Sequence, residues 1–261
     1  MTQEELNNVL DSHRRWLEMT KDLQRARLSG KDLTGRDLSS RDLSDAVFVR
    51  ANLSGANLER TKLFDAEMCH ANLTKADLRF ARLNRANLTA AEVVEANLEG
   101  ADLTNARLVL ADFTGARMDG TSLGYANLTH ANLSGADLRG ANAVNTNFAG
   151  ANLEGADLRD ASFEGACLRG ATLSGAQLNW WDNDLLAEIL RPRAEGDLDR
   201  ERWVAWIRAH RPFCWNEWET ILSPGVMRWM VECLQSFITV DDELPDPVVR
   251  IRKALREKAT A

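Results

Sequence analysis

The residue types that most often carry out chemistry are sparse in this chain and do not cluster. Cys69, Cys167, Cys214 and Cys233 are widely separated, with no CxxC pair and no Cys/His cluster. This spacing favours reduced thiols over a disulfide framework or a zinc site. The acidic run 241–243 matches no calcium-loop spacing and is typical of a solvated loop.

Catalysis requires titratable groups that converge on one place, and the sequence offers no convincing pair. His70 and His130 are the best candidates, yet 60 residues separate them. We therefore predict that the protein is not an enzyme, uses no cofactor and holds no metal ion.

Composition narrows the class of partner. The chain of 261 residues has 32 Lys and Arg against 39 Asp and Glu, a net charge of -7. It therefore lacks the basic footprint of proteins that bind nucleic acid directly. The N-terminus has no apolar stretch long enough for a signal peptide, and no run of 18 apolar residues occurs. We expect a cytoplasmic protein that does not enter the membrane.

The dominant feature of the sequence is a period of five. From Leu28 to Leu178 every fifth residue is Leu, Phe, Met or Val, with the single exception of Ala143. On a helix, five residues advance the chain by about 500°, which scatters these side chains around the axis. On a flat strand an odd spacing sends every second one to the wrong face. The chain must therefore turn once per repeat, as the coil of a solenoid does.

A second position in each repeat admits only small side chains. Two residues before each large apolar residue, from Ala46 to Ala176, the chain has alanine, or threonine at 61, 121 and 146. Such uniformity indicates tight stacking of one coil on the next. Earlier in the chain the same position holds Lys31, Arg36 and Arg41. We assign these three to the first coil, where no coil lies beneath and long side chains can turn outward.

The repeat units resemble a known motif. ANLSG at 51–55, ADLRG at 136–140 and ANLEG at 151–155 are similar to the A(D/N)LxX motif of the pentapeptide repeat family. The resemblance extends over about 150 residues. It implies a mainly β solenoid, a right-handed quadrilateral β-helix with four repeats per coil, and hence about eight coils here.

The repeat also divides the chain into three parts. Residues 1–25 are predicted to contain an N-terminal capping helix over 3–19, whose apolar face covers the first coil. Residues 26–179 form the β-helix. Residues 180–261 are rich in tryptophan and change to a helical period, which predicts an all-α C-terminal domain with helices at 183–190, 198–209, 215–222, 225–238 and 246–258.

These features favour a non-catalytic scaffold for protein–protein interaction, a rigid rod with a helical module that docks or dimerises. The protein partner is unknown, and a homodimer is compatible with the sequence. Outward residues of the rod that are candidates for partner contact are Phe64, Phe80, Val109, Leu110, Tyr125, Glu99 and Asp119. In the C-terminal part the interface candidates are Trp180, Trp181, Trp206 and Trp229.

The resemblance implies one alternative. Pentapeptide repeat proteins of the Qnr and mycobacterial fluoroquinolone-resistance types are dimeric DNA mimics that bind DNA gyrase. A mimic requires a continuous negative surface, whereas the outward charges here are mixed in sign. The unbroken period also leaves no room for the loops that project from the coil in Qnr proteins. Binding to gyrase, with inhibition or protection of that topoisomerase, is the second hypothesis.

Overall fold

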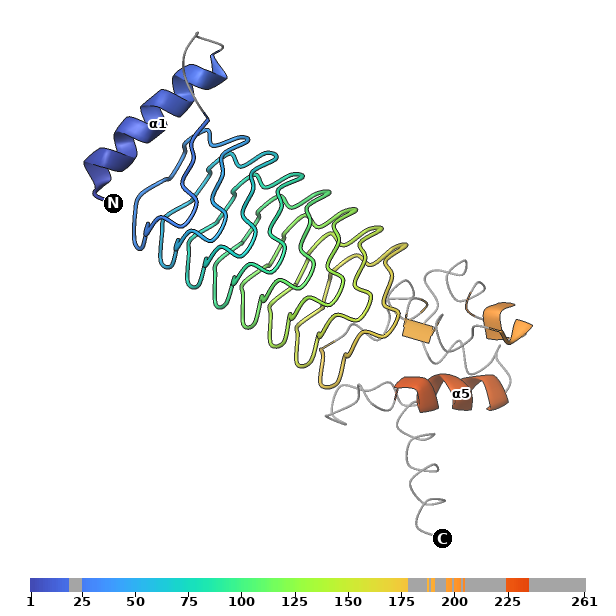
Figure 1. The fold of residues 1–261 in the computed structure, drawn as a ribbon. Helices are drawn as coiled ribbons and strands as arrows, with labels where there is room; N and C mark the ends of the chain where they lie inside the picture. The colour runs from blue at the N-terminus through green and yellow to red at the C-terminus, as the bar shows by residue number, and fades with distance from the viewer. Residues whose placement is uncertain are drawn as a thin grey trace.

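The computed structural model describes residues 1–18, 25–177, 187, 189–190, 196–198, 200–202, 204 and 224–234. It contains a stack of coils with helix α1 (Gln3–Leu17) at its N-terminal end and helix α5 (Pro224–Leu234) beyond its C-terminal end (Figure 1). The described residues of the rod confirm the solenoid predicted from the period of five.

Each coil consists of four repeats. Parallel bridges join residues twenty apart at every repeat, from Arg27 with Val47 to Asp157 with Gln177. Twenty residues therefore make one full turn of the chain. Because adjacent parallel strands lie about 4.8 Å apart, the seven and a half coils between residues 27 and 177 give a rod about 36 Å long.

Two side chains of each repeat point inward. The large apolar residues from Leu28 to Leu173 and the alanines between them are almost all buried, most with no exposed surface. The three threonines of the alanine position are also buried. Their hydroxyls donate to main-chain carbonyls of the preceding coil, at 2.9 Å for Thr61, 3.0 Å for Thr121 and 2.7 Å for Thr146. A buried hydroxyl is tolerated there because it has a partner.

In residues 52–56, a repeat with Asn before the large apolar residue, every backbone N–H group has a partner. Asn52 donates to the preceding coil at 2.9 Å, and Leu53 and Gly55 donate to the following coil at 2.6 and 2.9 Å. Ala56 donates to the Leu53 carbonyl at 3.0 Å and closes the turn. The remaining group, the Ser54 N–H, donates to Oδ1 of Asn52 at 3.2 Å.

This last bond explains why the motif contains Asp or Asn. A short side-chain oxygen at the position before the large apolar residue accepts the N–H two residues ahead, as in an Asx-turn. It recurs at the Asp and Asn residues in this position, from Asp32, whose Oδ1 lies 3.1 Å from the Thr34 nitrogen, to Asp157. The short polar residue therefore stabilises the turn wherever it occurs, although other residues, such as Arg107, also occupy this position.

The corner of each repeat is left-handed. All residues whose numbers are multiples of five, from Gly30 to Gly175, have φ between 53° and 70°. Glycine adopts this conformation freely, whereas other residues pay about 1 kcal/mol or more. Many corners here nevertheless hold larger side chains, including Phe80, Leu110 and Tyr125.

Helix α1 packs on the first coil. It begins with a capping box between Thr2 and Glu5 and ends at Leu17, two residues before the predicted end. The side chain of Gln3 donates to the carbonyl of Asp37 at 3.2 Å and accepts its N–H at 3.3 Å. In Figure 1 the helix lies across the end of the stack.

The open end of the first coil differs little from the prediction. Lys31 and Arg41 are exposed, whereas Arg36 is half-buried.

The five predicted C-terminal helices fall largely outside the described residues. Within those residues, 187, 189–190, 198, 200–202 and 204 are helical, and α5 begins at Pro224, one residue before the predicted start. The division into three domains remains a prediction.

His13 is expected to make the attachment of α1 sensitive to pH. Its side chain is buried, and its Nδ1 accepts the N–H of Ala26 at 3.0 Å, so the imidazole must be neutral at this atom. Burial lowers the pKa of His13 below its usual value, although Asp42 and Asp45 oppose the shift. The unfolded chain therefore takes up the proton first as the pH falls below about 6.5.

We expect the free energy of unfolding to decrease between pH 7.5 and pH 5.5, and the variant His13→Gln, which cannot titrate, to lose this part of the dependence. Urea unfolding at the two pH values measures it. A wild-type protein and a His13→Gln variant with the same pH dependence over this interval would contradict the role assigned to His13.

Candidate partner-binding surface

The coil has four faces, and their outward residues differ in chemistry. Each face contains two columns of side chains in which successive residues are twenty apart. We name three faces by their columns. The acidic face has columns starting at Asp32 and Thr34, the ion-pair face at Asp37 and Ser39, and the arginine face at Arg27 and Ser29. The ion-pair face and the arginine face lie on opposite sides of the rod.

The ion-pair face neutralises its own charges. Arg79 binds Asp77 at 2.6 Å and Glu59 at 3.4 Å, and Arg139 binds Asp137 at 2.6 Å. The hydrogen bond from Arg79 lowers the pKa of the Asp77 carboxyl, and Arg139 does the same for Asp137. Such exposed pairs each add about 0.2 to 1 kcal/mol, so they balance charge more than they stabilise the rod.

Two predicted contact residues belong to this face. Arg117 lies 3.6 Å from Glu99 and 4.0 Å from Asp119. Both carboxylates are half-buried. Glu99 and Asp119 are thus engaged with a cation of the same face, which weakens the prediction that they contact a partner.

The acidic face, unlike the ion-pair face, has no cation in its columns to balance its carboxylates. Its two columns contain Asp32, Glu92, Asp112 and Glu154 but no lysine or arginine. The other members are mostly Asn, Ser and Thr. The mixture of signs that the sequence suggested for the whole rod is therefore unevenly distributed over its faces.

The arginine face is richer in arginine than in acidic side chains. Its columns contain Arg27, Arg107 and Arg169 against a single acid, Glu67. One corner of the face adds Arg50, and the other adds Arg25, Asp45, Asp65 and Arg85. Arg27, Arg50 and Arg107 are exposed, and within the described ranges none of these three forms an ion pair.

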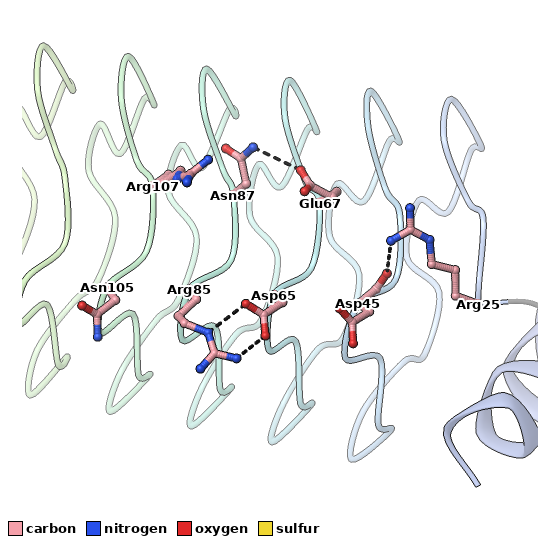
Figure 2. Close-up of a pocket in the computed structure, with 8 residues that line it drawn as sticks. All are labelled: Arg25, Asp45, Asp65, Glu67, Arg85, Asn87, Asn105 and Arg107. Carbon is pink, nitrogen blue, oxygen red and sulfur yellow. Dashed lines mark hydrogen bonds and ion pairs between the residues drawn. The ribbon is translucent and has the colours of Figure 1, made fainter. Parts of the chain in front are cut away.

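A groove of about 610 Å³ runs along this face (Figure 2). Two rows of side chains border it, one ending at Arg107 and the other at Asn105. Glu67 accepts a bond from Asn87 at 3.1 Å, and Arg85 forms a two-bond ion pair with Asp65. That pair lowers the pKa of the Asp65 carboxyl. The residues that line the groove are Arg25, Asp45, Asp65, Glu67, Arg85, Asn87, Asn105 and Arg107.

Two of the predicted apolar contacts already have partners within the rod. The guanidinium of Arg82 lies 4.6 Å from the centre of the Phe64 ring. The Phe80 ring has the guanidinium of Arg60 at 5.6 Å on one side and fills the space above Gly100, where a Cβ atom would come within 2.7 Å of it. These contacts give both rings a structural role and leave Phe80 46% exposed.

The other apolar candidates border the arginine face. Leu110 is 59% exposed and Tyr125 is 63% exposed, and they occupy opposite corners of this face on adjacent coils. Val109, half-buried, lies beside Leu110. The structure thus brings three of the predicted contact residues to one patch, next to Arg107. Partner binding by them remains a prediction.

Of the four predicted interface tryptophans of the C-terminal part, the structure describes one. Trp180, Trp181 and Trp206 lie outside the described residues. Trp229 belongs to α5 and is half-buried, with the guanidinium of Arg200 at 5.3 Å from its ring centre. Its predicted place in an interface is not tested.

The described part of the chain contains no group of three or more His, Cys, Asp or Glu placed to hold a metal ion. Among the helices that the structure describes, none has the length and apolar character needed to cross a membrane.

The coil geometry agrees with a comparison against protein families. The model for pentapeptide repeats matches eight copies that together extend over residues 42–175. The chain belongs to the pentapeptide repeat family. Pentapeptide repeat proteins fold as right-handed quadrilateral β-helices, the predicted architecture, and four repeats per coil are present here. A comparison with curated protein sequences found no match.

Solved structures with similar repeats come from several sources. HetL, involved in heterocyst differentiation regulation in the cyanobacterium Nostoc, is 29% identical over 62% of this chain and 93% of its own, with a TM-score of 0.26. A thylakoid-lumen protein of Arabidopsis thaliana is 33% identical over 43% and 71%, with a TM-score of 0.30. The plasmid-mediated fluoroquinolone resistance protein QnrB1 is 22% identical over 64% and 95%, with a TM-score of 0.46. These scores are low, so the assignment rests on the repeat itself.

Sequence reasoning missed the groove and the unneutralised arginines. It compared the signs of charges along columns on other sides of the rod but did not follow the column of Arg27 and Arg107. A coil length of twenty would have been enough to predict that Arg27 and Arg107 share a column. The contact between Phe80 and Gly100 also had a signal, since glycine follows phenylalanine at the same corner one coil later.

A bulky residue at a left-handed corner reduces stability. The variant Leu110→Gly is therefore expected to raise the free energy of unfolding by about 0.5 to 1 kcal/mol, because glycine relieves the strain at φ 59° and Leu110 buries little surface. Urea unfolding measures the change. The control Leu108→Gly, at a buried position of the same repeat, is expected to destabilise the rod by several kcal/mol. Equal destabilisation by both variants would contradict the analysis of the corner.

Proposed function

We propose that the protein is a non-catalytic scaffold that binds another protein through the arginine face of its β-helix. The observation that carries the proposal is the patch formed by Val109, Leu110 and Tyr125. Two of these side chains are large, apolar and more than half exposed at strained corners, where glycine would be more stable. Residues kept at a cost in stability are candidates for function.

The rod suits this role because its backbone is self-satisfied. Each coil is bonded to the coils on either side, so the outward columns keep fixed positions. A rigid surface loses little conformational entropy on binding. Pentapeptide repeat proteins are typically structural or interaction proteins, which agrees with the proposal.

The Trp-rich segment 180–261 is proposed to act as a docking or dimerisation module beside the rod. Helix α5 is the part of it that the structure describes at length, and Met227, Met230 and Val231 of this helix are buried.

A photo-crosslinking experiment tests the use of the arginine face. We expect p-benzoylphenylalanine in place of Asn127 to crosslink a protein partner in host lysate, and the same group in place of Asn97 to give no such product. The two positions are matched, since each asparagine accepts the N–H two residues ahead, at 3.1 and 3.2 Å, on opposite faces. The additional change Tyr125→Gly should abolish the product. Products that are equal from both positions, or that persist with Tyr125→Gly, would refute the proposal.

A second function, mimicry of DNA towards gyrase, is supported by the acidic face alone. The carboxylates of Asp32, Glu92, Asp112 and Glu154 form a surface without a cation in either column. Such a surface would meet the basic groove of a DNA-binding enzyme.

A supercoiling assay with DNA gyrase separates the two functions. If the scaffold proposal is right, micromolar protein neither inhibits gyrase nor protects it from a quinolone. If mimicry is right, the effect is present, is lost in Glu92→Gln/Asp112→Asn and is retained in Glu59→Gln, a change on the ion-pair face. An effect on gyrase that is lost in Glu92→Gln/Asp112→Asn would favour DNA mimicry over the scaffold.

A further inference from the structure

We infer that the arginine face recognises an acidic protein segment that carries a large apolar side chain. The inference rests on the proposed function and specifies the chemistry of the partner. Its ground is the place where Arg107 lies: at the end of the groove, in the same repeat as Val109 and Leu110 and one coil before Tyr125.

The charge of Arg107 is available to a partner. The matched residue on the opposite face, Arg117, occupies the same position of its repeat but lies 3.6 Å from Glu99. Arg107 is exposed and has no ion pair among the described residues, and its column neighbours twenty residues away are Asn87 and Asn127. A carboxylate from a partner can therefore bind Arg107 without displacing an existing acid.

Further cations extend the positive charge toward the N-terminal end. Arg27 and Arg50 are likewise exposed without an ion pair in the described ranges. Arg27 and Arg107 are four coils apart, and Arg50 lies between them along the rod. A single extended segment along the rod axis can therefore reach more than one of these arginines. Because these charges are exposed, their attraction is expected to weaken as salt is added.

The apolar patch of Val109, Leu110 and Tyr125 is the reason for expecting a large apolar side chain in the partner segment. Tyr125, Arg107 and Leu110 lie on one face, and aromatic residues and arginine contribute much of the binding energy at the centre of protein interfaces. An apolar side chain of the partner would contact Leu110 or Tyr125 while the partner's carboxylates bind the arginines. The two kinds of contact lie on one face and can act together.

Nucleic acid fits this face less well than a protein segment. The groove beside Arg107 also contains Asp45, Asp65 and Glu67. Phosphates spaced evenly along a strand would meet these carboxylates, whereas a protein segment can place neutral residues opposite them. A second copy of the chain also fits less well, since the face would bring its own arginines together.

Selection from a library of random 12-residue peptides displayed on phage tests the inference. Wild-type full-length protein is the target, and the variant Arg107→Gln/Tyr125→Gly is used for counter-selection. We expect the enriched peptides to combine at least one Phe, Trp or Leu with two or more Asp or Glu. Enrichment of basic or uncharged peptides, or no enrichment at all, would overturn the inference.

The best enriched peptide, labelled with fluorescein, is then titrated by fluorescence anisotropy. Its Kd is expected to rise about fivefold with Arg107→Gln, to rise about tenfold with Tyr125→Gly and to remain unchanged with Arg117→Gln. Equal effects of Arg107→Gln and Arg117→Gln would refute the assigned face. The unfolding curve of each variant, measured in parallel, excludes loss of structure as the cause.

Two further measurements exclude the other occupants. Binding of a labelled 20-base-pair DNA duplex that is lost with Arg107→Gln would make nucleic acid the ligand. A dimer in sedimentation equilibrium that dissociates with Tyr125→Gly would make the occupant a second copy. Either result overturns the inference. The proposed function fails separately: a protein crosslinked from position 127 in the absence of any acidic-peptide binding would leave the scaffold standing and remove only this partner chemistry.

Discussion

The turn that closes every fifth residue is the constraint on which this structure depends. It has a left-handed residue at each corner, a large apolar side chain inside and, in most repeats, a side-chain acceptor for the one N–H that does not bond to a neighbouring coil. Asp or Asn supplies that acceptor from Asp32 to Asp157. An unpaired buried N–H costs about 1 to 3 kcal/mol, so repetition of this small bond matters over a whole rod. The motif of the family is in this sense a solution for hydrogen bonding as much as for packing.

Apart from the Asp and Asn residues that accept the N–H two residues ahead, few outward side chains of the described rod bond to the backbone. The outward side chains stack in columns twenty residues apart. Their charges are distributed unevenly over the faces. The ion-pair face engages its cations with carboxylates, as Arg79 does with Asp77, whereas Arg107 on the opposite face has only asparagines above and below it. The difference between faces, more than the net charge of the chain, defines the surface offered to a partner.

Much of this was predictable from single residues. The period of five from Leu28 to Leu178 predicted the solenoid, and the small residues between predicted tight stacking, because both follow from local geometry. The amphipathic helix at the N-terminus was also predicted, although its end at Leu17 was not, since the last turn of a helix depends on its contacts. The interaction partners of outward residues were harder to predict. Arg117 reaches Glu99, eighteen residues earlier, rather than the residue directly below it.

The sequence by itself determined which side chains are inside and where the chain turns. Those properties depend on a residue and its nearest neighbours along the chain. Only the tertiary structure decided which outward residues are free. Phe80 and Tyr125 occupy equivalent corners, yet the Phe80 ring packs between Arg60 and Gly100 while Tyr125 remains mostly exposed. That outcome depends on the residues one coil above and below, and on how each side chain reaches them, which no five-residue pattern contains.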